Sequence, residues 1–218
     1  MADQDHLDVL HQGIAVWNHW RQEHHSIQPD FSRVDFTGAH LGRVNLAGAR
    51  LSGADFSGAD LRESLLSRAD LSEAILSRAN LARADLQGAT LSAAILSDAN
   101  LSDAMLSDAV LSDADLTGAL LSGAEVTGTD FSGVDFSEAD LSGLDFSQAN
   151  THGARLGKAS FSRRSETLLA ESSQQSLRAA TPRQQGSTLM MRSSFAQRLY
   201  VPAVFGRYAT SAFPVPLA

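Results

Sequence analysis

Apolar and polar residues follow a fixed five-residue pattern over more than half of the chain. The pattern begins near Phe31 and ends near Phe161 without an insertion or deletion. The central residue of the unit is Leu or Phe in 25 of 27 repeats, with Val126 and Thr151 as the exceptions. Ala stands two residues earlier in 20 of the 27 repeats. Typical units read ADFSG (54–58), ANLSD (99–103) and ADLSG (139–143).

This period is incompatible with an α-helix. Five residues advance a helix by about 140°, which would spread the central Leu over every side. In an extended chain, by contrast, the Ala and the Leu share one face and the residue between them points the other way. Units that cannot bury their apolar face alone must stack, so the pattern predicts an all-β solenoid. Thr151 and its neighbours predict fraying from about residue 150.

The repeated unit resembles that of the pentapeptide-repeat proteins, over residues 29–162. The resemblance implies a right-handed quadrilateral β-helix with four repeats in each 20-residue coil, or about seven coils in all. It also implies that Leu and Phe fill the centre and that Ala occupies the tight inner sites. Outward residues 20 positions apart should then lie above one another. The columns that this register predicts are Glu63–Arg83–Asp103, Arg78–Asp98, Asn80–Asn100 and Ile75–Ile95.

Residues 1–28 are predicted to cap the solenoid at its N-terminal end. Apolar residues spaced three and four apart predict one helix of about five turns over residues 3–23. They are Leu7, Leu10, Ile14, Trp17 and Trp20. The stretch WNHWR (17–21) resembles a WNxWR segment of bacterial pentapeptide-repeat proteins, which leads into a first repeat like Pro29–Asp30. We interpret the helix as a cap, with docking to another protein as the alternative.

Residues 163–218 lose the period and are predicted to form a basic, poorly ordered tail. The segment combines Arg with Phe195, Tyr200, Phe205, Tyr208 and Phe213. Binding to another partner or folding back on the solenoid are the alternatives. Basic and aromatic residues also bind single-stranded nucleic acid. No nucleic-acid-binding module is recognisable in the sequence, so direct nucleic-acid binding is not expected.

The net charge of −8 is unevenly distributed along the chain. Residues 29–83 carry seven Arg and seven acids, whereas residues 84–154 carry twelve acids and no Lys or Arg. Because Cys is absent, disulfides and thiolate metal sites are excluded. The sequence has no 18-residue apolar run and no apolar signal segment at its start. A soluble, cytoplasmic protein without membrane contact is therefore expected.

No enzyme chemistry is expected from the sequence. Most Ser residues occupy one repeat position and reflect the period, so they do not mark nucleophiles. No phosphate-binding loop or dinucleotide fingerprint is present. His24 and His25 have no Cys nearby and are interpreted as solvated residues. We predict no catalytic, cofactor-binding or metal-binding residues.

Two sets of outward residues are candidates for binding a partner. One is apolar at a position where this repeat family usually has Asp or Asn; the other places one Asp at each corner of a single coil. Clustered apolar residues mark contact sites, although scattered surface aliphatics are also ordinary, and both readings stay open. The candidates are Leu65, Ile75, Ile95, Met105, Val110 and Leu120, and Asp98, Asp103, Asp108 and Asp113.

The sequence therefore favours a non-enzymatic interaction or scaffold module whose protein partner is unknown. A homodimer is a further option. The alternative is a DNA mimic, since some members of the resembled family bind type II topoisomerase (gyrase) and protect it from quinolone-like poisons. The neutral charge of residues 29–83 and the uninterrupted repeats weigh against that alternative.

Overall fold

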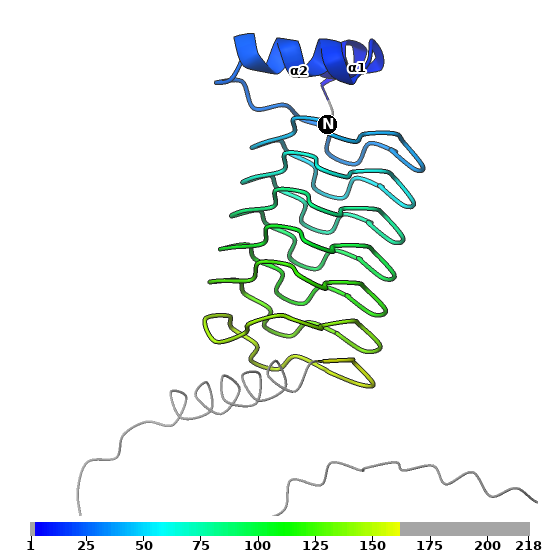
Figure 1. The fold of residues 1–218 in the computed structure, drawn as a ribbon. Coiled ribbons are helices and arrows are strands. Elements are labelled where there is room, and N and C mark those ends of the chain that lie inside the picture. The colour runs from blue at the N-terminus through cyan, green and yellow to red at the C-terminus, as the bar shows by residue number, and fades with distance from the viewer. Residues whose placement is uncertain (1–2, 162–218) are drawn as a thin grey trace, which may run out of the picture. The chain divides into compact units, whose positions relative to one another are not determined.

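The computed structural model describes residues 3–161 of the chain. Two helices, α1 (Gln4–His11) and α2 (Ile14–Glu23), lie at one end of a stack of coils that begins at Asp30 and continues to Ser160 (Figure 1). The predicted tail of residues 163–218 lies outside the described residues. Within residues 3–161, neither helix is long and apolar enough to cross a membrane.

Each five-residue unit makes one corner of a coil. In a representative unit, the N–H of Ala54 donates a 3.0 Å hydrogen bond to the carbonyl of Leu51, which closes a turn. Gly53, the third residue of this turn, has a φ of 65°, as type II turns require. The N–H of Gly53 in turn reaches the carbonyl of Ser72 in the next coil at 2.9 Å. A unit therefore turns the chain and joins two coils.

Parallel bridges join residues 20 positions apart, as the register predicted. Asp70, for example, donates its N–H to Ala49 at 2.9 Å, and its carbonyl accepts from Leu51 at 2.7 Å. In the described residues, however, each contact is an isolated one-residue bridge, and no longer strand is present. The reason is the short repeat: two of five residues form the turn, which leaves too few to extend a ladder along one side.

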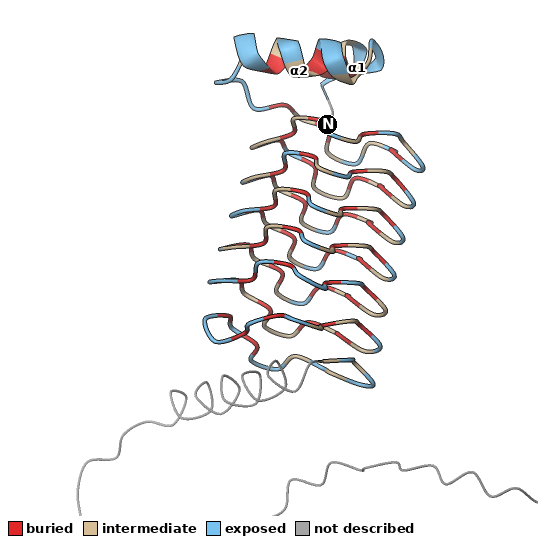
Figure 2. Ribbon diagram, viewed as in Figure 1, coloured by how far each residue is buried: buried red, intermediate tan, exposed pale blue. Residues whose placement is uncertain are grey.

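The interior is a continuous column of apolar side chains. Buried residues recur in the successive coils of the stack (Figure 2). Leu or Phe centres and the preceding Ala are buried together through most of the stack. Three polar residues replace inner apolar residues and are also buried, namely Ser64, Thr129 and Thr151. Thr129 is stabilised there by a 2.8 Å hydrogen bond from its Oγ1 to the carbonyl of Leu106. Burial of each large apolar side chain contributes about 1.5–3 kcal/mol before chain entropy is subtracted.

The prediction of one continuous N-terminal helix is wrong, because the helix is interrupted at Gly13. This residue has φ 112° and ψ 159°, outside helical geometry. The N–H groups of Gln12 and Gly13 donate to the carbonyls of Val9 and Leu10, which closes the end of α1. Gly populates such conformations at no steric cost, which the apolar spacing alone does not reveal.

Helix α2 is fastened to the first coils by hydrogen bonds from side chains to backbone. Trp17 is fully buried, and its Nε1 donates to the carbonyl of Asn45 at 2.8 Å. Arg21 is also buried and donates to the carbonyls of Ile27 at 2.7 Å and Ala47 at 2.9 Å. Burial lowers the pKa of Arg21. These bonds satisfy backbone carbonyls at the end of the stack, which an uncapped solenoid would expose.

At the other end, pairing continues further than the predicted fraying implied. Asp140 bridges to Ser160, and the N–H of Leu141 bonds to the carbonyl of Ser160 at 2.8 Å. Burial nevertheless decreases there: Leu156 and Phe161 are only partly buried. The last described coil is thus paired through its backbone but has less apolar contact than the coils before it.

Candidate interaction surface

The outward residue before each Leu or Phe usually stabilises the following turn. In fifteen described units an Asp or Asn stands there and its Oδ1 accepts a hydrogen bond from the N–H two residues later. Asp70 with Ser72, at 3.1 Å, is an example. This is the Asx-turn geometry, which explains the frequency of Asp and Asn at this position.

Six apolar residues occupy the same outward position and cannot make this bond. The structure distributes them over four different columns. Ile75 and Ile95 are bridged to each other and adjoin on one side. Leu65 and Met105 share a second side, with Asp85 between them. Val110 and Leu120 each lie in a column of their own.

The six residues also differ in exposure. Leu65, Ile95 and Leu120 are 43%, 40% and 46% exposed, and the other three are intermediate. Their proximity in the sequence therefore does not make them one patch. Ile75 and Ile95 are the two that are bridged to each other on adjacent coils. The signal was already in the sequence, because residue numbers that differ by a multiple of 20 identify members of one column.

Asp98, Asp103, Asp108 and Asp113 lie at four successive corners, each with a positive φ of 56–60°. All four are exposed. Each side chain leans towards the glycine directly below it in the next coil. A Cβ added to any of these glycines would meet the Oδ1 of the Asp above. The pairs are Asp98–Gly118, Asp103–Gly123, Asp108–Gly128 and Asp113–Gly133.

This arrangement of Asp over Gly was missed by sequence reasoning. Asp tolerates the left-handed region better than most residues with a side chain, so local geometry accounts for part of the preference for Asp at these corners. Glycine below provides the space in which the carboxylate lies. The sequence did contain a signal for these pairs, because each Gly stands 20 residues after its Asp.

Elsewhere the predicted columns are present. Glu63 lies between Arg43, at 2.9 Å, and Arg83, at 3.9 Å. Arg78 lies 3.9 Å from Asp98 in the next coil. Hydrogen bonding by Arg43, followed by its charge, lowers the pKa of Glu63. Asn80 is bridged to Asn100.

Asp60 forms a two-point ion pair with Arg62. Arg62 donates from Nε to Asp60 Oδ1 at 2.8 Å and from Nη2 to Oδ2 at 2.7 Å. The side-chain hydrogen bonds from Arg62 lower the pKa of Asp60 to about 2. Since both partners are side chains of one turn, this pair stabilises local structure and is not by itself a binding site.

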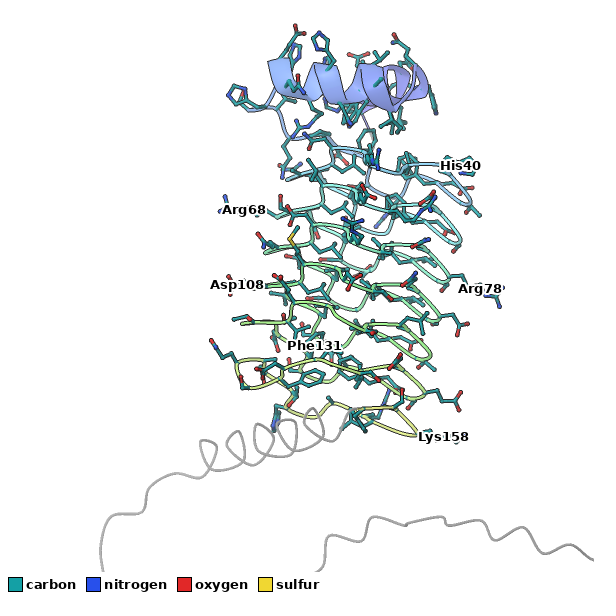
Figure 3. The ribbon with its side chains drawn as sticks, in the orientation of Figure 1. His40, Arg68, Arg78, Asp108, Phe131 and Lys158 are labelled. Carbon is teal, nitrogen blue, oxygen red and sulfur yellow. The ribbon has the colours of Figure 1, made fainter. Side chains whose placement is uncertain are left out.

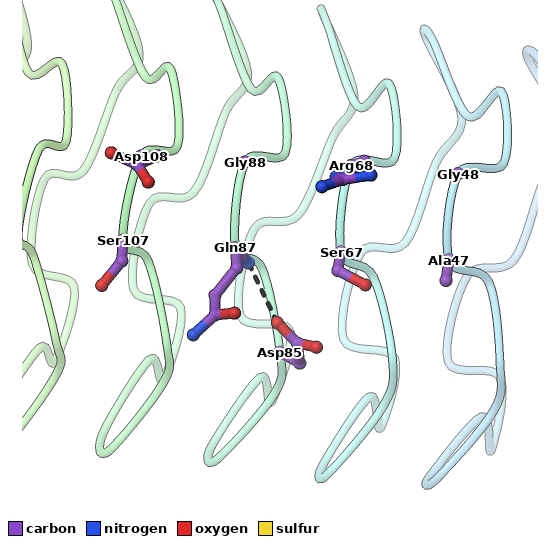
Figure 4. Close-up of a pocket in the computed structure, with 9 residues that line it drawn as sticks. All are labelled: Ala47, Gly48, Ser67, Arg68, Asp85, Gln87, Gly88, Ser107 and Asp108. Carbon is purple, nitrogen blue, oxygen red and sulfur yellow. Dashed lines mark hydrogen bonds between the residues drawn. The ribbon is translucent and has the colours of Figure 1, made fainter.

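A groove with a volume of about 690 Å³ lies along one corner of the stack (Figure 4). We call it the Gly88 groove. One row of residues down the corner is Gly48, Arg68, Gly88 and Asp108, and the neighbouring row is Ala47, Ser67, Gln87 and Ser107. Asp85 borders the groove and accepts from the N–H of Gln87 at 3.1 Å. Arg68 and Asp108 project from one edge of the solenoid, and Arg78 from another (Figure 3).

Among residues 3–161, no three His, Asp or Glu side chains gather closely enough to hold a metal ion. His24 instead stacks on Trp20, with ring centroids 4.6 Å apart, and its Nδ1 lies 2.9 Å from the Trp20 carbonyl. His6 is packed edge-on against Trp17 and Trp20. His6 and His24 thus have structural contacts within the cap.

Parallel one-residue bridges at a 20-residue period, with an apolar interior and a turn in each repeat, define a β-helix solenoid. The model of the family described as pentapeptide repeats matches the chain in eight copies, between residues 30 and 163. The chain belongs to this family, whose solenoid is the right-handed β-helix. No curated protein sequence gives a significant match.

Several solved structures are similar to the chain. HetL, a pentapeptide repeat protein involved in heterocyst differentiation regulation in the cyanobacterium Nostoc, is 30% identical, with 60% of this chain and 73% of HetL covered and a TM-score of 0.32. A second Nostoc pentapeptide repeat protein is 28% identical, with coverages of 68% and 95% and a TM-score of 0.38. A trypsin-treated form of QnrB1, a plasmid-mediated fluoroquinolone resistance protein, is 25% identical, with coverages of 65% and 84% and a TM-score of 0.29.

Proposed function

We propose that the chain is a non-enzymatic interaction or scaffold module, and that it binds a protein partner through the Ile75–Ile95 pair. The pair is the observation that carries the proposal. Two β-branched apolar residues are joined by a backbone bridge on adjacent coils, at an outward position where Asp or Asn otherwise stabilises the turn. Neither Ile can accept that hydrogen bond, so turn stability does not explain these residues.

The surroundings of the pair indicate the chemistry of the partner. Along the column, Ile75 and Ile95 are preceded by Asp55 and followed by Asp115. An apolar centre between two acids fits a partner surface with an apolar residue flanked by Lys or Arg. Regular turns and a repeated backbone make the solenoid a rigid support for such a contact. The 20-residue register and its four corners support a quadrilateral coil of about seven turns.

Affinity capture with the full chain tests this proposal. Wild-type bait, an Ile75→Asp/Ile95→Asp variant and a control Val110→Asp/Leu120→Asp variant are compared quantitatively. The control makes the same chemical change in two other columns. We expect one protein to be retained by wild type and control and lost with the Ile75/Ile95 variant, while circular dichroism is unchanged in all three. Equal retention by all three baits would remove the pair from consideration.

Gyrase binding by DNA mimicry is the second proposal, and the charge of residues 84–154 is what favours it. Twelve acids without a Lys or Arg can steer the chain towards a basic surface. The expected result is inhibition of gyrase supercoiling that is lost when Asp98, Asp103, Asp108 and Asp113 are all replaced by Asn. Uninhibited gyrase with folded wild-type protein would contradict it. The cytoplasmic location stays a prediction.

A further inference from the structure

The Gly88 groove contains two opposite charges without partners. Arg68 and Asp108 lie in the same corner row with Gly88 between them. Stacked coils are about 4.8 Å apart, so the two residues start about 10 Å from each other. Within residues 3–161 neither side chain forms an ion pair, in contrast to Glu63 with its two Arg neighbours. The row thus carries a positive group, Arg68, whose stem lies beside Gly88, and a negative group, Asp108, whose carboxylate leans towards Gly128.

We propose that the Gly88 groove is the contact surface of an antiparallel homodimer, with a two-fold axis at Gly88. In this dimer Arg68 of each copy pairs with Asp108 of the other. The proposal deepens the proposed function and rests on it, because it assigns a second copy of this chain as one protein partner of the outer surface.

The order of residues along the corner satisfies the symmetry of such a dimer. A two-fold contact places the same surface of both copies together, in opposite directions. Reversing the row Gly48, Arg68, Gly88, Asp108 and Gly128 sets Arg against Asp and Gly against Gly. In the neighbouring row, Ser67 faces Ser107 and Gln87 faces its own copy. No like charges oppose each other within the two rows.

The adjacent side adds an apolar contact about the same axis. Leu65 and Met105 belong to the same two coils as Arg68 and Asp108 and share one column. The two-fold axis therefore places Leu65 of one copy against Met105 of the other. Asp85 lies between them and faces its own copy beside the axis, which limits the affinity. A weak dimer that is sensitive to salt is expected.

The other corners do not place unpaired opposite charges against each other across such an axis. About comparable axes, Glu63 would oppose Asp103, and Glu73 would oppose Asp113, so like charges would repel. Arg78 and Asp98 are complementary, but they already lie 3.9 Å apart within one chain. This corner provides a matched control, because it carries the same two charge types on the same fold.

Sedimentation velocity of the full chain over a concentration series tests the dimer. Wild type should dimerise at low salt and dissociate at about 0.5 M salt. Arg68→Asp and Asp108→Arg should each weaken the dimer about tenfold, because each change sets like charges against each other twice. The double variant should restore it, and an equal mixture of the two single variants should form heterodimers. Circular dichroism verifies that each variant folds.

Reversal of Arg78 and Asp98, singly and together, should leave the dimer unchanged. Monomeric wild type at every concentration would overturn the proposal, and so would a dimer that survives both single reversals at the Gly88 groove. Equal weakening by reversals at both corners would also overturn it, since net charge alone would then explain the result. Failure of the dimer can be distinguished from failure of the Ile75–Ile95 proposal. If the Arg68→Asp variant still captures a protein other than this chain, partner binding through Ile75 and Ile95 is supported whether or not the dimer forms.

Discussion

The Arg-containing segment (residues 29–83) and the acidic segment (residues 84–154) share one interior but have different corners. Leu and Phe are buried in both. In the first segment, Glu63 is held between two Arg side chains, and glycines such as Gly58 have open space beside them. In the second, four corner Asp side chains lie over four glycines. The interior therefore determines the coil, and the surface can change charge without changing it.

The largest effect should be equal in the two segments. Leu51 and Leu111 are both completely buried, one in each segment. Replacing either by Ala should lower the free energy of unfolding by about 2–5 kcal/mol, because a cavity is left in a continuous core. Denaturant unfolding followed by circular dichroism measures this. If Leu111→Ala were much milder than Leu51→Ala, the conclusion that both segments share one interior would be wrong.

A corner glycine should distinguish the segments. Gly58 and Gly118 lie in the same column and have φ values of 64° and 69°. Gly58→Ala should cost about 1–2 kcal/mol, the penalty for a Cβ in the left-handed region. Gly118→Ala should cost more, because its Cβ would lie 2.5 Å from Oδ1 of Asp98, whereas Gly58 has nothing within 4 Å. Thermal and denaturant unfolding of the two variants give the comparison.

A double-mutant cycle isolates the contribution of Asp98. Asp98→Ala should reduce the extra cost of Gly118→Ala towards the value for Gly58→Ala, because the contacting carboxylate is absent. An Asp98→Ala/Gly118→Ala variant whose losses simply add would show that the Asp and the Gly do not depend on each other.

The interior and the register could be predicted from the sequence because both are periodic. A Leu every five residues determines which side chains point inwards, and the 20-residue coil brings Ile75 to Ile95 and Asn80 to Asn100. Each of these predictions depends only on position along the chain. The one-residue length of the bridges was less evident, since it depends on how many residues the turn uses.

Features without a period were not predicted. Gly13 interrupts the N-terminal helix although the apolar spacing continues across it. Arg21, a charged residue, is buried because its guanidinium reaches backbone carbonyls that are remote in sequence. The direction in which Asp98 leans over Gly118 is a rotamer choice that the repeat pattern does not encode. The tertiary contacts of individual side chains determine these features.

Acid should affect an Asp of the Arg-containing segment most. The pKa of Asp60 is lowered from 3.8 to about 2 by the side-chain hydrogen bonds from Arg62. A depressed folded pKa contributes stability above the unfolded value, so this contribution should be complete above about pH 4 and lost as the pH falls towards 2. Asp60→Asn should lower stability at neutral pH and flatten its pH dependence in that window.

Asp140 is the matched residue beyond residue 84. Hydrogen bonds from Ser142 and Ser160 lower the pKa of Asp140 without an Arg partner, the bond from Ser142 being the larger cause. Asp140→Asn should therefore change the acid unfolding profile in the same direction but less than Asp60→Asn. Equal profiles for the two variants would show that Arg62 is not the source of the difference. Denaturant unfolding at a series of pH values provides the measurement.

The smallest expected effect concerns the exposed corner charges, and its sign should differ between the segments. Glu63→Gln removes a carboxylate that contacts two Arg side chains, so stability should fall slightly, and less at high salt. Asp103 lies two coils further along the same column, among twelve acids. Asp103→Asn should leave stability unchanged or raise it slightly, because removing one charge reduces repulsion within the segment. Unfolding of both variants at low and high salt checks the two signs. If both variants were destabilised by the same amount, the two corners would be electrostatically equivalent, and the difference between the segments would be wrong.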